Sequence, residues 1–84
     1  MKYKAEVTVT LKNGVRDPQG AALDTVLKRT KIEEDSNVNV GKYFSFTLTA
    51  EDENEAKKKA NQICEDVLSN PILESYKIGR FEKL

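Results

Sequence analysis

The chain has 84 residues, and its 14 Lys plus Arg balance its 14 Asp plus Glu, so the formal net charge is zero. A chain of this length forms one domain, residues 1–84, whose apolar core is marginal unless a disulfide, a metal or a partner adds burial. The balanced charge provides no field that would favour nucleic acid or an anionic membrane. We therefore expect a single domain that gains burial by self-association.

Neither a membrane span nor a secretory signal is apparent, because no apolar run approaches the roughly 20 residues of a spanning helix. This predicts a cytoplasmic protein. The chain contains one cysteine and no histidine. A lone cysteine without histidine gives no internal disulfide, no zinc cluster and no Cys/His nucleophile pair. We expect no catalytic residue, metal or cofactor in this chain, and an independent enzyme is disfavoured.

The first element is a strand over residues 2–12, where apolar and polar side chains alternate strictly. Such alternation is typical of a strand with one buried face. Asp17 then suits the N-cap of a helix, and Pro18 suits its first position. The helix is predicted over residues 18–31. Its apolar stripe consists of Ala22, Leu23, Val26 and Leu27.

Alternation resumes at Val38 and Val40 and continues in the same phase at Phe44 and Phe46. Two strands joined by a tight loop at residues 41–43 fit this phase best, because a three-residue loop would pair Val40 with Phe44 on one face. Gly41 would then serve as a loop residue able to adopt positive φ, with Lys42 at the solvated tip. The alternative is one long strand with a bulge.

The run from residue 51 to 69 is the most secure helix, with acidic residues early and apolar residues spaced by three and four. Asn70-Pro71 ends it, because proline cannot continue the helical hydrogen bonds. A final strand is predicted over residues 74–82. Within it, Gly79 permits a bulge that would bring Phe81 inward beside Tyr76 and Ile78.

The element order βαββαβ predicts an α+β, ferredoxin-like fold with a four-stranded antiparallel sheet and two helices on one face. The other face of the sheet would carry uncharged polar side chains where Lys and Glu are more usual. We expect this face, or an edge of the sheet, to mediate a homo-oligomer, although an ordinary solvated face of good strand formers gives the same pattern. These side chains are Thr8, Thr10, Ser45, Thr47 and Thr49.

Gly20 stands out because a glycine at the third position of a helix costs roughly 1 kcal/mol relative to alanine. Either a partner or an anion approaches the exposed N–H groups there, or the residue is a tolerated glycine after a plain cap. Cys64 lies on an apolar helical stripe and is expected to be an inert core residue. The carboxylates of residues 51–55 are interpreted as helix-dipole and solubility residues rather than a metal site. Aromatic residues near Gly41 share the core phase, which argues against RNA binding.

Three separated motifs resemble those of the PurS family, the small subunit of phosphoribosylformylglycinamidine synthase, an amidotransferase of purine biosynthesis. The first spans residues 12–20 and departs from the family pattern only at Arg16. The second spans residues 38–43 and lacks a basic residue at Asn39. The third spans residues 64–76 and includes Asn70 and Pro71. The resemblance covers nearly the whole chain.

The resemblance implies a non-catalytic subunit that bridges a glutaminase subunit and an ATP-dependent synthetase subunit, so that ammonia from glutamine reaches formylglycinamide ribonucleotide. ATP and magnesium would belong to the synthetase, and this chain would form a homodimer or a higher oligomer. The alternative class is a stand-alone dimeric regulatory module that binds a small ligand. The residues expected to contact partners or to shape contact loops are Lys12, Asp17, Gln19, Gly20, Gly41, Lys42, Asn70 and Glu74.

Overall fold

A computed structural model describes residues 1–84. Strand β1, Lys2–Leu11, is followed by helix α1, Pro18–Arg29, and strand β2, Gly41–Thr49. Helix α2, Glu53–Ile63, continues as a π-helical turn, Cys64–Leu68, before strand β3, Glu74–Lys83. The first and last strands and both helices therefore lie close to their predicted positions. No helix has the length and apolarity needed to cross a membrane.

The sheet has three antiparallel strands in the order β2-β1-β3, with β1 in the centre. The α+β class is as predicted, but the four-stranded sheet is wrong. Residues 38–40 form no strand, and β2 begins directly at Gly41, which lies opposite Thr10 in the ladder with β1. The tight loop predicted over residues 41–43 is absent because these residues belong to the ladder itself.

The predicted bulge in the last strand is confirmed. Opposite β1, Phe81 pairs with Ala5 and Ile78 pairs with Val7, so Gly79 and Arg80 together face the single residue Glu6. This extra residue turns the Phe81 side chain inward, where its ring stacks on Tyr3 with centroids 5.7 Å apart. The bulge thereby adds an aromatic pair to the core.

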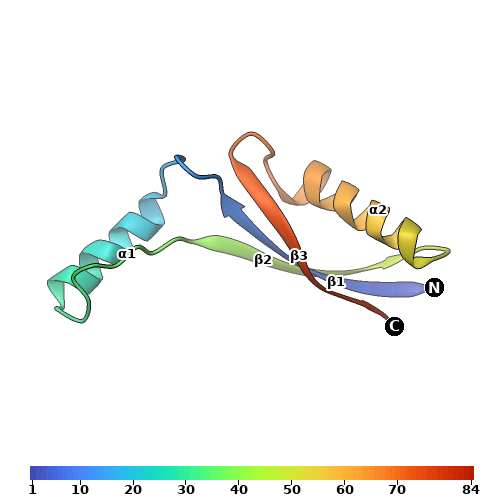
Figure 1. The fold of residues 1–84 in the computed structure, drawn as a ribbon, viewed down its shortest axis with the longest axis horizontal. Coiled ribbons are helices and arrows are strands. Elements are labelled where there is room, and N and C mark those ends of the chain that lie inside the picture. Colours follow the sequence, from blue (N-terminus) through green and yellow to red (C-terminus); the bar gives the residue numbers. More distant parts are fainter.

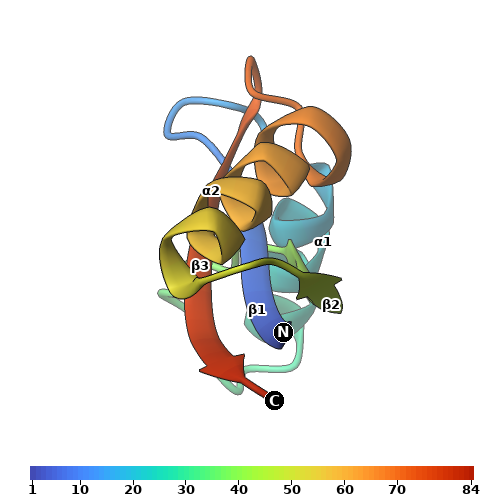
Figure 2. The same ribbon diagram turned by 90° about the vertical axis from the view of Figure 1, so that its right-hand side faces the viewer.

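The core lies between the sheet and α2, which runs along one face of the sheet (Figure 2). Small residues of α2, Ala56 and Ala60, are fully buried and let the helix approach closely, and Cys64 extends the same stripe. The inward side chains of β1 beneath it are also buried. They are Tyr3, Ala5, Val7 and Val9.

Helix α1 does not pack on this core, so the prediction of two helices on one face is also wrong. Figure 1 shows α1 beyond one end of the sheet, while α2 covers the other end. The molecule extends 53 Å along its longest axis. Leu23 and Val26 of the α1 stripe are accordingly 47% and 41% exposed.

Candidate functional site

The start of α1 is held by one carboxylate. Asp17 Oδ1 accepts a hydrogen bond of 2.9 Å from the Gly20 amide, which confirms the predicted N-cap. Its other oxygen, Oδ2, accepts a bond of 2.9 Å from the amide of Val40, just before β2. Asp17 therefore joins the helix start to the chain segment that returns to the sheet. These two amides, with Val40 the stronger, hold the pKa of Asp17 below its ordinary value of 3.8, although burial opposes this.

Gly20 is required by a close approach within the chain. A Cβ placed on Gly20 would lie 2.1 Å from the Val38 carbonyl oxygen, far inside any tolerated contact. Both interpretations of this glycine from the sequence are therefore incomplete. The backbone that approaches it is the chain's own segment, and the Gly20 amide is already donated to Asp17, which removes this donor from an anion site.

A second carboxylate repeats the arrangement two turns along α1. Asp24 Oδ1 accepts bonds of 3.0 Å from the Val38 amide and 2.7 Å from the Ser36 hydroxyl. Asp17 and Asp24 are seven residues apart and so share one face of the helix. Residues 15–40, which we call the arm, are thus held together by carboxylates rather than by an apolar core.

The turn after α2 is held by several polar contacts. Asn70 Oδ1 accepts a hydrogen bond of 3.0 Å from the backbone amide of Ile72, and the backbone amide of Asn70 donates one of 2.8 Å to Glu74 Oε1. Lys12 lies against the same turn. Its ammonium group donates a hydrogen bond to the Pro71 carbonyl oxygen, and its backbone amide donates one of 2.9 Å to the Leu73 carbonyl oxygen. Asn70 and Lys12 therefore shape this turn.

Glu74 connects the turn to β2, because its second oxygen, Oε2, lies 3.8 Å from Lys42 Nζ. Lys42 is directed across the sheet opposite Val9 rather than standing at the tip of a loop. Gly41 beside it has no positive φ. A Cβ there would meet the Val9 carbonyl oxygen at 2.8 Å, so glycine is needed for close packing, not for a turn.

The structure brings all eight predicted residues to the same end of the sheet. Five of them line a cavity of about 290 Å³ between the arm and the sheet. The remaining three are bonded to this group through the Asp17 cap and the 70–74 turn. We call the set the docking corner. The five lining residues are Asp17, Gln19, Gly41, Lys42 and Glu74.

Within the docking corner, Gln19 differs from its neighbours. Its side chain is exposed and makes no hydrogen bond within the chain, whereas Asp17, Asn70 and Glu74 are all bonded internally. The internal bonds of these three side chains explain their presence by folding alone. The polar groups of the Gln19 side chain are therefore not explained by bonding within the chain.

Apolar side chains next to the docking corner were missed by the sequence reading. Ile72 is 81% exposed and Leu73 is 46% exposed. Both lie in the turn that Asn70 and Lys12 bond in place. Val67, which is 74% exposed, lies in the preceding π-helical turn. Rigid, exposed apolar groups are a feature of docking surfaces. The signal in the sequence was Ile72-Leu73 directly after the helix stop at Pro71.

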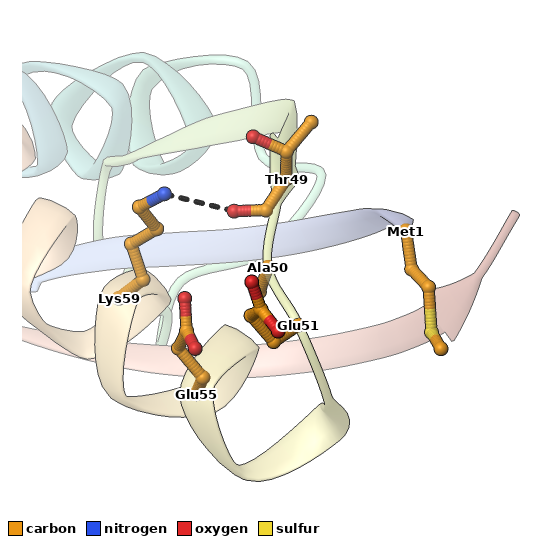
Figure 3. Close-up of a pocket in the computed structure, with 6 residues that line it drawn as sticks. All are labelled: Met1, Thr49, Ala50, Glu51, Glu55 and Lys59. Atoms are coloured by element: carbon orange, nitrogen blue, oxygen red, sulfur yellow. Dashed lines mark hydrogen bonds between the residues drawn. The ribbon is translucent and has the colours of Figure 1, made fainter.

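A different depression, of about 500 Å³, lies at the opposite end of the sheet (Figure 3). Lys59 reaches across it and donates a bond of 2.8 Å to the Thr49 carbonyl. Nearby, Asp52 caps α2 by accepting a bond of 2.8 Å from the Glu55 amide. No group of three or more His, Cys, Asp or Glu residues in the chain is arranged to hold a metal ion. The depression is open and polar, and its lysine is already bonded to the backbone.

Cys64 is fully buried on the α2 stripe, as predicted. Burial, with a smaller effect of Glu65, raises the pKa of its thiol. The same two causes raise the pKa of Tyr76, whose hydroxyl donates a bond of 3.0 Å to Asn61 Oδ1. Both groups therefore stay neutral at physiological pH, and neither suits nucleophilic chemistry.

Comparison with known proteins adds a family to this geometry. The sequence model for PurS, described as phosphoribosylformylglycinamidine (FGAM) synthase, matches residues 4–82. The Synechocystis subunit PurS of this synthase is 35% identical over 74 residues, covering 88% of this chain and 74% of that one. The Bacillus subtilis subunit is 35% identical over 75 residues, covering 89% and 88%.

Solved structures of similar chains share the whole fold. Thermus thermophilus PurS matches with a TM-score of 0.82 and 34% identity, covering 100% of this chain and 99% of that one. A chain in the structure of PurLQS from Thermotoga maritima matches with a TM-score of 0.83 and 28% identity, covering 94% and 96%. The fold of this chain, with its three-stranded sheet and projecting arm, therefore matches theirs over nearly the full length.

Proposed function

The chain belongs to the PurS family and is a non-catalytic subunit of phosphoribosylformylglycinamidine synthase in purine biosynthesis, and we propose that its docking corner holds the glutaminase and synthetase subunits together. In this role the chain supplies surface rather than chemistry. Ammonia released from glutamine then reaches formylglycinamide ribonucleotide within one assembly. ATP and magnesium act on the synthetase subunit, and this chain carries no cofactor of its own.

One observation carries the proposal of the docking corner. The free side chain of Gln19 and the exposed apolar group of Ile72 lie on two rigid supports at one end of the molecule. The supports are the Asp17 cap and the Asn70 turn, so little conformational entropy is lost when a partner binds. A polar and an apolar contact at fixed positions favour binding to a protein surface.

We also propose that the chain is at least a homodimer in the assembly. The support is the arm, whose apolar stripe is exposed in the single chain and would be covered in an oligomer. Because the fold of one chain leaves this stripe uncovered, self-association would supply burial that the marginal core lacks. The mass of the isolated protein by sedimentation at micromolar concentration tests this separately from docking.

The docking corner is tested with Gln19→Ala against a matched control, Gln62→Ala. Both glutamines are exposed on helices, and neither side chain is hydrogen-bonded within the chain. We expect Gln19→Ala to weaken binding to the synthetase and slow glutamine-dependent amidination, while the melting temperature stays near that of the wild type. Gln62→Ala should change none of these quantities. Unchanged binding and turnover in Gln19→Ala would remove this side chain from the interface.

Ile72→Ala and Ile32→Ala form a second matched pair, since these isoleucines are 81% and 74% exposed. Ile72→Ala should reduce subunit affinity roughly tenfold, as for a contact that is well packed in a complex. Ile32 lies at the far end of the arm, so its replacement should leave subunit affinity unchanged. The reverse result would move the docking surface to the arm. Amidination driven by added ammonia tests separately whether the synthetase needs this subunit for its active conformation.

A further inference from the structure

Gly79 is the one glycine of the chain whose presence the fold does not explain. Gly14 has a positive φ of 86°, and a Cβ on Gly20 or Gly41 would lie 2.1 or 2.8 Å from a backbone oxygen. Gly79 has no positive φ, so its bulge does not require glycine, and a Cβ there would meet only the Glu6 carbonyl oxygen at 3.8 Å, an ordinary contact. Glycine weakens the interior of a strand and is found where another backbone approaches closely. Gly79 therefore indicates a close approach to β3 from outside the chain.

A groove lies beside Gly79 between α2 and the edge of β3, with a cavity of about 480 Å³. Its floor is apolar, because Tyr76, Ile78 and Phe81 are only half-buried beside α2. Its rim is polar, and the Tyr76 hydroxyl there donates a hydrogen bond of 3.0 Å to Asn61 Oδ1. The missing side chain at residue 79 leaves the groove open in the middle of the strand. The lining residues are Lys57, Asn61, Tyr76, Ile78, Gly79 and Phe81.

Two of these residues also present free main-chain groups. β3 is an edge strand, since the order of the sheet is β2-β1-β3. The Lys12 amide donates to the Leu73 carbonyl oxygen where the ladder of β1 and β3 begins, and bonding to the neighbouring strand alternates along an antiparallel ladder. By this alternation the amide and carbonyl groups of Tyr76 and Ile78 point away from β1, and no hydrogen bond outside the ladder uses them. A further strand would therefore bond to the residues that form the floor of the groove.

The charges along β3 indicate what kind of segment fits this edge. From residue 75 to 83 the strand carries the cations Lys77, Arg80 and Lys83 and a single carboxylate, Glu82, which lies 3.4 Å from Arg80. Lys77 and Lys83 form no ion pair within the chain. Pairing of two β3 edges would bring the cations of two copies together, and like charges on adjacent strands are destabilising. An acidic segment complements this edge, and a second copy does not.

We propose that the free edge of β3 binds an extended acidic segment of a partner polypeptide, which adds a fourth strand to the sheet. Apolar and acidic residues alternate in this segment, because successive side chains of a strand point to opposite faces. The apolar side chains enter the groove at Tyr76 and Ile78, and the acidic ones lie on the other face beside Lys77 and Arg80. Main-chain hydrogen bonds supply affinity in such strand addition, and side-chain pockets supply specificity. The edge shares no residue with the docking corner, so this inference stands apart from that proposal.

The edge is tested by binding of peptides to the whole chain, measured by fluorescence anisotropy. The probe is a labelled peptide of 10 residues, the length of β3, in which valine and glutamate alternate. In antiparallel pairing the valines lie opposite Tyr76 and Ile78, and their amides point to β3. We expect N-methylation of the valines to weaken binding roughly tenfold or more, and N-methylation of the glutamates to leave it near the unmodified value. Equal effects of the two methylations, or no binding at up to about 1 mM peptide, would overturn the proposal.

The groove is tested with Gly79→Val against Ser75→Val, since Ser75 is exposed on the same strand and lies outside the groove. Both variants should keep or raise the melting temperature, because valine is a strong strand former. Gly79→Val should also weaken peptide binding roughly tenfold by filling the groove, and Ser75→Val should not. A lower melting temperature in Gly79→Val would show that the fold itself needs this glycine, and unchanged binding would show that the groove is not used. Either result overturns the proposal.

The charge is tested with Lys77→Gln against Lys58→Gln, since Lys58 is exposed on α2 outside the groove. Lys77→Gln should weaken binding of the acidic peptide about two- to fivefold at low salt and less at high salt, and Lys58→Gln should leave it unchanged. A peptide with lysine in place of glutamate should bind roughly tenfold more weakly, and equal binding would overturn the acidic partner. A change in the sedimentation mass of the chain in Gly79→Val would assign the edge to a second copy and overturn the proposal. Binding of the synthetase, measured through Gln19, is a separate readout.

Discussion

Replacing Gly20 by alanine should destabilise the protein, although helix propensity alone predicts the opposite. In a helix, alanine is favoured over glycine by about 1 kcal/mol. Here the new Cβ would lie 2.1 Å from the Val38 carbonyl oxygen, so the returning segment would have to move by at least about 1.3 Å to reach an ordinary contact distance. Such a movement disrupts the bonds from Val38 to Asp24 and from Val40 to Asp17, at 3.0 and 2.9 Å.

Forcing an extra methyl group into a filled site costs about 1–3 kcal/mol. The net effect of Gly20→Ala is therefore a loss of up to about 2 kcal/mol, once the gain in propensity is subtracted. Thermal unfolding at fixed protein concentration, together with hydrogen exchange of the Val38 and Val40 amides, measures this. Gln19→Ala is the control, because it adds no atom beside the segment. A higher melting temperature and slower exchange in Gly20→Ala would show that the segment does not lie where it blocks a side chain.

Four further changes have defined outcomes. Cys64→Ser should cost about 1–2 kcal/mol by burying a hydroxyl, partly relieved by a bond back to a helical carbonyl, and should leave amidination per folded molecule unchanged in the assembled synthase. Lys31 has a φ of 60°, a left-handed conformation that glycine adopts without penalty. Lys31→Gly should therefore raise the free energy of unfolding by about 0.5 kcal/mol, measured by thermal unfolding. Phe81→Ala removes a half-buried ring that stacks on Tyr3. It should lower the free energy of unfolding by about 2 kcal/mol, measured by urea unfolding. The folded-state pKa of Asp17 is lowered, so the contribution of this carboxylate to stability is present above pH 3.8 and is lost as pH falls through the lower folded-state pKa. We expect faster hydrogen exchange of the Val40 amide in acid.

The sequence predicted the ends of the helices and the bulge in β3 correctly, because these features depend on residues that lie next to one another in the chain. Asp17 and Pro18 favour a helix start, Pro71 cannot continue a helix, and Gly79 permits the bulge that turns Phe81 inward. The residues of the docking corner were named from the sequence, and their role in docking stays a prediction. Its members follow helix starts, helix stops and strand starts, and these points meet at one end of the sheet when the strands are antiparallel.

The error at residues 38–43 has a physical cause in the phase of the alternation. A three-residue loop and an uninterrupted run both leave Val40 and Phe44 in the same phase, so periodicity alone does not separate them. The difference lies at Lys42, which the loop places in solvent and the uninterrupted run places on the inner face. There it has a carboxylate partner, Glu74, 32 residues away in sequence. The contacts that decide between them, from Val38 and Val40 to the carboxylates of α1, involve backbone amides that have no signature in the sequence.

The α1 stripe was predicted correctly as an amphipathic pattern and wrongly as a contact with its own sheet. Amphipathicity specifies that a face must be covered, but not whether the covering surface belongs to the same chain. The relevant information lies in how the chain enters and leaves the helix. Asp17 and Asp24 tie α1 to the segment before Gly41, and that segment is collinear with β2, so the helix is carried away from the sheet (Figure 1).

Lys42 and Glu74 depend on each other within the docking corner, so a change at either one mixes docking with folding. Lys42 lines the cavity of the docking corner, and neutralising it would leave Glu74, whose side chain is 15% exposed, without its cationic partner. Gln19 lines the same cavity, and its side chain makes no hydrogen bond within the chain. Loss of synthetase binding in Gln19→Ala with an unchanged melting temperature would therefore report on docking alone, whereas the same loss with a lowered melting temperature would show that Gln19 supports the fold instead.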